Sequence, residues 1–219
     1  MIIRKAKTDD IEHMISIKHN LLITNPGENK ISNGFMLDPS YDQFLSFVKD
    51  CNTLILEDNK IKRIVGYCII MPDRNLRISD LWRQKDLIRW KDFDFEKIEN
   101  DPICYLEQLA VLPNPRHKFY APALAFQSVL DGFEMGHKHL FTVLLNFPVR
   151  NMAAISMLKR IGAIEIGSAE DFFKGAGNLG VDVYYLEAKM FVDKVRIDNS
   201  PDYYRAKRRV DKNKKLFLS

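Results

Sequence analysis

One stretch of the sequence brings together residue types that could bind an anion and move a proton. An apolar run at residues 103–112 contains a single carboxylate, Glu107, and ends in a Pro-Asn-Pro turn. Three basic residues then precede an apolar segment that predicts a helix from about residue 121: Arg116, His117 and Lys118. Because a helix N-terminus presents free backbone N–H groups and a positive dipole, this order predicts a phosphate site. A solvated basic turn between a core strand and a core helix is the alternative.

The elements that must position these residues follow from apolar periodicity and from capping and turn signals. Strands are predicted at 2–7, 53–57, 61–71, 103–112, 140–145, 163–167 and 181–190. Helices are predicted at 8–22, 38–50, 121–136 and 151–161. The resulting order, β-α-α-β-β-insertion-β-α-β-α-β-β, predicts an α/β protein with a mixed sheet and helices on its faces.

Composition places the chain among soluble globular proteins, since 46% of its 219 residues are hydrophobic and 28% are charged. No apolar run approaches the ~18 residues of a membrane span, and the N-terminus lacks the apolar core of a signal peptide. The three cysteines form no C-x-x-C pair, which argues against a disulfide framework or a zinc cluster. We therefore expect a cytoplasmic protein without a metal.

The positive charge is confined to the end of the chain. Residues 191–219 hold nine Lys or Arg against four Asp, which gives this segment a net charge of +5. Since the formal net charge of the whole sequence is +4, residues 1–190 have a net charge of −1. We expect a domain at 1–190 with a partly helical insertion at 72–102, and a basic, helical tail at 191–219. Nucleic acid could bind only through that tail, and a solvated terminal helix is its alternative.

Two motifs in this order resemble those of the GNAT superfamily of acyl-CoA-dependent N-acetyltransferases. The run Tyr-Leu-Glu-Gln-Leu-Ala-Val-Leu-Pro at 105–113 is similar to the family's central strand, and 116–121 is similar to its pyrophosphate loop. The segment 151–163, which begins at an Asn and ends in Gly-Ala, is similar to the second family signature. The likeness spans roughly residues 2–190 and implies a mostly antiparallel mixed sheet whose strands splay apart where acyl-CoA binds.

The resemblance also implies roles for individual residues. Backbone groups of the central strand would pair with the pantetheine arm, at Leu109, Ala110 and Val111. Backbone N–H groups of the loop would hold the pyrophosphate, at Arg116, His117, Lys118, Phe119, Tyr120 and Ala121. Asn151 would contact the pantetheine or cap its helix, and capping alone explains an Asn there. Glu107, two residues before Leu109 and so expected on the same strand face, is the candidate general base, with an ion pair in the strand as the alternative.

The sequence departs from the family pattern at two positions. Phe119 replaces a loop glycine, and a side chain costs about 1 kcal/mol where the backbone must be left-handed or lie against a ligand. Leu158 falls where many members have the tyrosine that protonates the thiolate, so Tyr120, Tyr105 or water would supply that proton. Leu158 could instead line an apolar pocket for a longer acyl chain.

The sequence therefore predicts an N-acetyltransferase that moves an acetyl group from acetyl-CoA directly to a primary amine. A catalytically silent acyl-CoA or partner-binding module and a longer-chain acyltransferase are the alternatives. The acceptor and the oligomeric state, a homodimer included, stay open. The paired histidines His137 and His139 lack a third ligand and do not predict a metal site.

Overall fold

The computed structural model describes residues 1–23, 35, 37–38, 40–114, 117, 120–170 and 179–197. The segment 24–34, the loop residues Arg116, Lys118 and Phe119, and the tail from residue 198 onward lie outside the described residues. The predictions made for them are therefore not tested by the structure.

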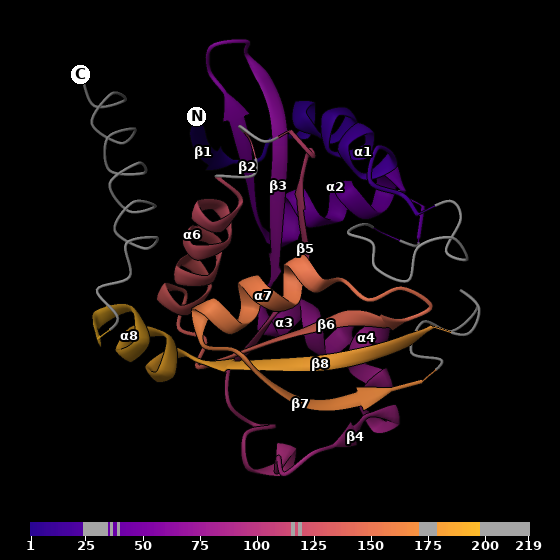
Figure 1. The fold of residues 1–219 in the computed structure, drawn as a ribbon, viewed down its shortest axis with the longest axis vertical. Coiled ribbons are helices and arrows are strands. Elements are labelled where there is room, and N and C mark those ends of the chain that lie inside the picture. The colour runs from indigo at the N-terminus through magenta and orange to yellow at the C-terminus, as the bar shows by residue number, and fades with distance from the viewer. Residues whose placement is uncertain are drawn as a thin grey trace.

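The described strands form one eight-stranded mixed sheet in the order β1-β2-β3-β5-β6-β8-β7-β4. Their bounds are β1 Ile2–Lys5, β2 Asn52–Asp58, β3 Arg63–Met71, β4 Arg89–Trp90, β5 Ile103–Val111, β6 His139–Phe147, β7 Ile164–Ala169 and β8 Gly180–Glu187. Only β5 and β6 pair in parallel, and the other neighbours are antiparallel. The predicted mixed, mostly antiparallel sheet is thus confirmed, and Figure 1 shows β2 and β3 running steeply while β6, β8 and β7 run across the view.

Helices cover both faces of this sheet (Figure 1). Their bounds are α1 Ile11–His19, α2 Tyr41–Asp50, α3 Asp73–Ile78, α4 Asp80–Arg83, α6 Ala121–Glu134, α7 Met152–Ile161 and α8 Ala188–Ile197. One apolar cluster joins α1, α2 and α3 to one face, which we call the α1 face. A second cluster joins α6, α7 and α8 to the other, which we call the α6 face. The sheet is therefore buried on both sides, as its near-continuous apolar strands require.

Local sequence explains the clearest helix boundaries. The Asn151 side chain accepts a hydrogen bond of 3.0 Å from the N–H of Ala154 and so caps α7. Gly162 ends the same helix with φ of +96°, a left-handed conformation that favours glycine. Pro122 lies in the first turn of α6, where its missing N–H costs no intrahelical bond.

The insertion at 72–102 packs on the α1 face instead of forming a loose linker. It contains α3, α4, two 3-10 turns and β4, a two-residue strand that pairs with β7 at the sheet edge. Trp90 stacks on Phe95 at 5.0 Å, and Phe95 in turn meets Phe141 of β6. The prediction that the tryptophans anchor this segment agrees with these contacts, whereas β4 is absent from the predicted elements.

The end of the last strand was placed wrongly. Residues 188–190 begin helix α8, so β8 ends at Glu187. Phe191, the first residue of the expected tail, is 1% exposed and packs against Phe126 and Phe133 of α6. Alternation of apolar residues alone cannot separate a strand end from the first turn of a helix.

Candidate active site

The pairing between β5 and β6 stops after three residues. Ile103, Cys104 and Tyr105 pair with 139–141 of β6, although both strands continue for six further residues. At the point of divergence the Thr142 hydroxyl donates to the carbonyl of Leu106 at 2.8 Å, so a side chain replaces the next backbone bond. The predicted divergence of the central strands is confirmed.

The unpaired half of β5 offers backbone groups to a ligand. Leu112 donates its N–H to Val65 of β3, and successive residues of a strand direct their polar groups to alternate sides. Leu109 and Val111 therefore direct theirs away from β3, toward the unpaired side, whereas Ala110 directs its groups toward β3. The backbone of residues 109 and 111 is thus available to an extended, hydrogen-bonding chain.

Glu107 occupies a β-bulge in β5. Ile69 of β3 pairs with Gln108 and Ile70 with Leu106, so Glu107 is the extra residue between them. The alternation of faces breaks here, since Leu109 packs on the α6 face while Gln108 bonds to Tyr67 on the α1 face. The expectation that Glu107 shares a face with Leu109 is therefore wrong, because it assumed an unbroken period of two.

The carboxylate of Glu107 interacts with groups on the α1 face. It is partly buried, and its charge acts on Lys18 of α1, on Cys51 after α2, and on Tyr67 and Tyr105. Burial raises the pKa of Glu107, while a hydrogen bond with Gln108 and the charge of Lys18 oppose that rise. A carboxylate whose pKa is raised toward neutrality is better matched to accept a proton from an amine.

The described part of the predicted pyrophosphate loop is only partly open to an anion. The N–H of His117 donates to Asn114 and that of Tyr120 donates to the carbonyl of His117, both at 2.9 Å. His117 is buried, with a side chain that is 10% exposed, and its Nε2 lies 3.7 Å from Oδ2 of Asp58. His117 and Tyr120 thus already use their N–H groups, whereas Ala121 begins α6, where N–H groups lack intrahelical partners.

Two of the remaining predicted site residues, Asn151 and Leu158, have structural roles on the α6 face, and the third, Tyr105, lies on the α1 face. Asn151 caps α7, as described above, which is one of the two roles considered for it. Leu158 is 1% exposed within the second apolar cluster, between Ile155 and Ile161 of the same helix. Tyr105, one candidate proton donor, is buried at 5% exposure, and burial raises its pKa well above the ordinary value.

The thiols and histidines do not add a nucleophile or a metal centre. Burial raises the pKa of Cys51, Cys68 and Cys104 to about 12, so these thiols stay protonated at neutral pH. Within the described residues, the His, Cys, Asp and Glu side chains form no group of three that could hold a metal ion. None of the described helices is long and apolar enough to span a membrane.

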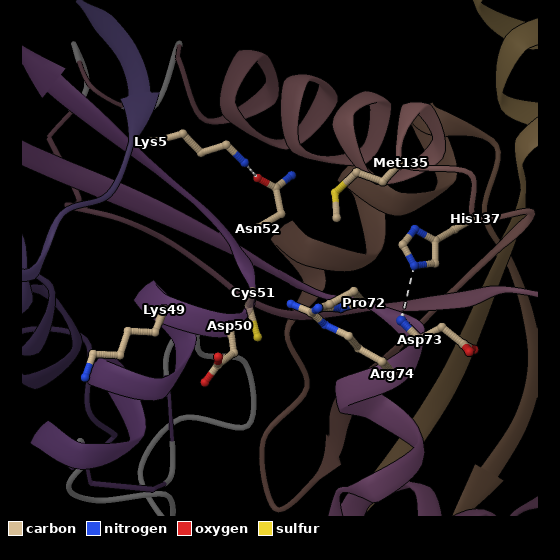
Figure 2. A pocket seen from close by; sticks show the side chains of 10 residues that line it. All are labelled: Lys5, Lys49, Asp50, Cys51, Asn52, Pro72, Asp73, Arg74, Met135 and His137. Carbon is tan, nitrogen blue, oxygen red and sulfur yellow. Dashed lines mark hydrogen bonds between the residues drawn. The ribbon is translucent and has the colours of Figure 1, made fainter.

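A pocket of about 510 Å³ lies at the other end of β5 from the divergence (Figure 2). Asn52 at the start of β2 and Arg74 just after β3 line it, and β3 ends opposite Tyr105. His137 is held there by two hydrogen bonds, since one ring nitrogen bonds to the carbonyl of Gly132 and the other accepts from the N–H of Asp73. The pocket thus lies beyond the start of β5, and Cys51, on which the charge of Glu107 acts, is one of its lining residues.

Two residues near the divergence were not singled out from the sequence. Thr142 lies in an apolar run typical of any buried strand, so nothing distinguished it. Lys18 did carry a signal, because it lies on the apolar face of its predicted helix, among residues such as Met14 and Ile15. A lysine at such a position is uncommon, and in the structure it is 3% exposed.

Comparison with known proteins identifies the architecture. No protein-family model and no curated protein sequence matches this chain. Solved structures do match, and each of the following three covers 85% of this chain. Mosquito arylalkylamine N-acetyltransferase like 5b is 16% identical with a TM-score of 0.59 and is covered over 99% of its length, and the putative acetyltransferase yncA from Salmonella typhimurium with acetyl-CoA is 16% identical with a TM-score of 0.55 and is covered over 93%. An acetyltransferase of the GNAT family from Streptococcus pneumoniae is 15% identical with a TM-score of 0.55 and is covered over 98% of its length. Together with the divergent parallel pair at the centre of the sheet, these matches show that the chain has the GNAT N-acetyltransferase fold.

Proposed function

We propose that this protein is an N-acetyltransferase that moves an acetyl group from acetyl-CoA directly to a primary amine. The observation that carries the proposal is the bulged Glu107, which lies two residues beyond the last β5–β6 backbone pair. The bulge thus places a carboxylate of raised pKa beside the unpaired strand segments, where both substrates could meet.

The donor would bind along the unpaired half of β5. Residues 109 and 111 would hydrogen-bond the pantetheine arm through their backbone groups, while the N-terminus of α6 would face the pyrophosphate. Ala121 and Ala123 carry the described donors there, since Pro122 has no N–H and the N–H groups of His117, Tyr120 and Leu124 are engaged. Because fewer backbone N–H groups are available to the pyrophosphate here than in an open glycine-containing loop, we expect a modest affinity for acyl-CoA.

The acceptor would lie on the α1 face, where Glu107 can take a proton from its ammonium group. The neutral amine then attacks the thioester carbonyl and a C–N bond forms; the C–S bond breaks, the attacking nitrogen releases its second proton to solvent, and the CoA thiolate takes up a proton. Tyr120, the residue directly before α6, is our candidate donor of that proton, with water as the alternative.

A direct transfer agrees with the state of the three thiols. A covalent acyl-cysteine intermediate requires a thiolate, and burial keeps the pKa of Cys51, Cys68 and Cys104 at about 12. Initial-rate kinetics should therefore give the intersecting lines of a ternary complex, not the parallel lines of a substituted enzyme.

Two measurements test this function together. Calorimetry with acetyl-CoA tests the donor site, and release of free CoA in the presence of a panel of amines tests the transfer. Glu107→Gln should bind acetyl-CoA as the wild type does and should lose turnover by about 10²–10⁴-fold at neutral pH. Glu165→Gln is the matched control, since Glu165 of β7 forms an ion pair with Lys91, the residue that follows the edge strand β4, and its loss should leave both readouts unchanged.

The outcomes separate the alternatives. Binding without turnover of any amine would support a catalytically silent module, and tighter binding of palmitoyl-CoA than of acetyl-CoA would support a longer acyl donor. Full turnover by Glu107→Gln would remove Glu107 from the mechanism.

A further inference from the structure

Lys18 is a buried cation that lies against aromatic rings. It lies on α1 and is 3% exposed, with its Nζ 5.5 Å from the ring centroid of Phe35 and 5.8 Å from that of Phe44. Among the residues that the structure describes, none makes an ion pair with it within 4 Å. Aromatic faces attract an ammonium group, but this attraction is much weaker than a contact ion pair with a carboxylate.

Such a residue is costly to keep. A buried ammonium group loses its hydration, and burial correspondingly lowers the pKa of Lys18. Replacement of buried charge by an apolar side chain of similar volume is often neutral or stabilising. Lysine at this position therefore does not serve the stability of the fold, and a functional reason is required.

A chain of contacts connects Lys18 to the bulge in β5. Below the ammonium group, the ring of Phe44 meets Tyr67 of β3 edge-on at 5.5 Å between centroids. The hydroxyl of Tyr67 donates to Oε1 of Gln108 at 2.9 Å, and Gln108 adjoins Glu107. The cluster thus spans α1, α2, β3 and β5 on the face where the acceptor would bind.

The charges in this cluster are few. The charge of Glu107 acts on Lys18, Cys51, Tyr67 and Tyr105, and of these Lys18 is the one basic group and the one whose charge acts on Glu107 in return. Lys18 in turn senses Glu107 and Asp38. Burial raises the pKa of Glu107 and Lys18 is the cation that opposes the rise, so the two effects set the pH at which the carboxylate ionises.

We propose that Lys18 is a positioning residue of the acetyl-transfer site, whose ammonium group keeps Glu107 in its ionised, proton-accepting form. The inference rests on the proposed function, in which Glu107 is the base. Lys18, on α1, acts on the Glu107 carboxylate of β5 through its charge and touches neither substrate.

Lys18→Met tests the proposal, because methionine fills similar volume without charge. The acid limb of the kcat/KM profile should move up by on the order of one pH unit, while acetyl-CoA affinity stays unchanged. Lys18→Arg should restore the wild-type profile. The melting temperature of Lys18→Met should be equal to or above that of the wild type, so lost activity would not reflect lost folding. Lys49→Met, which removes an exposed lysine from the end of α2, is the control and should leave the profile unmoved.

A direct titration keeps the inference separate from the activity. With ¹³C-labelled glutamate, the carboxyl resonance of Glu107 is assigned by its loss in Glu107→Gln and followed against pH in wild type and Lys18→Met. An upward shift of its pKa in Lys18→Met supports the proposal even if no amine is acetylated. An unchanged pKa overturns it, even if the wild type proves to be an acetyltransferase. Failure of acetyl-CoA to bind the wild type would instead count against the proposed function.

Discussion

Gly66 on β3 is the position where one added methyl group should disturb the proposed donor site most directly. It pairs with Val111 at the end of β5, and a Cβ there would lie 2.7 Å from the carbonyl oxygen of Ala110 and 2.9 Å from Cγ2 of Val111. The first contact is with backbone, which cannot rotate away, so β5 must shift by several tenths of an ångström. We expect Gly66→Ala to lower the free energy of unfolding by about 1–3 kcal/mol, the usual cost of overpacking.

Gly132 provides the matched control for the same substitution. It lies inside α6, where a Cβ would meet only Sγ of Cys104 and Cγ2 of Ile70, both at the ordinary contact distance of 3.4 Å. Since alanine exceeds glycine in helix propensity by about 1 kcal/mol, Gly132→Ala should stabilise the protein by up to that amount. One chemical change is thus expected to have opposite signs at two buried positions.

Urea unfolding and acetyl-CoA calorimetry measure the two consequences. The denaturation midpoint should fall for Gly66→Ala and rise or stay equal for Gly132→Ala, and only the former should weaken acetyl-CoA binding. A free energy of unfolding for Gly66→Ala within about 0.5 kcal/mol of the wild type would refute the close approach of β3 and β5. Normal acetyl-CoA affinity in a clearly destabilised Gly66→Ala would refute the placement of the donor along residues 109–111.

Three further predictions concern single interactions. Asn151→Ala should cost about 0.5–2 kcal/mol in urea unfolding through loss of the α7 cap, with acetyl-CoA affinity unchanged; weakened affinity in a variant of normal stability would instead favour the pantetheine role. Thr142→Val should cost about 1–3 kcal/mol, because the buried carbonyl of Leu106 loses its donor, and a neutral result would show that another group replaces it. Arg4→Met should shift acid unfolding to higher pH. Burial opposes ionisation of Asp10, but the hydrogen bonds from Arg4 and from the N–H of Lys7, together with the charge of Arg4, outweigh it and lower the pKa of Asp10. The stability is therefore present above about pH 4 and is lost as pH falls. An unchanged acid transition in circular dichroism would contradict that reasoning.

The sequence predicted most elements because each has a local signal. The Asn and Gly at the two ends of α7, the polar turn between β2 and β3, and the apolar run of β5 are readable from neighbouring residues alone. The mostly antiparallel pairing and the divergence of the central strands were implied by resemblance, since strand pairing depends on residues far apart in the chain.

The errors in the site have a common physical origin. A bulge depends on how a strand meets its neighbour, so the alternation of Leu106 to Leu109 carries no sign of it. The N–H groups of His117 and Tyr120 are likewise used by turns that depend on the packing of His117 near Asp58. Lys18 was visible as an anomaly on an apolar helix face, but its relation to Glu107 required the fold.

The bulge in β5 also limits how this strand can change in length. Side chains alternate between the two faces of the sheet both before and after the bulge, but the extra residue shifts this alternation by one position. Deletion of one residue at 107 or 108 would restore a regular ladder without exchanging the faces of the flanking residues, since β3 already pairs on both sides. Deletion of one residue at 109 or 110 could also be absorbed by closing the bulge, but it would turn Gln108 to the α6 face, into an apolar core. The strand can therefore lose its carboxylate without losing the fold, so a chain of this architecture can preserve its structure while its chemistry is lost.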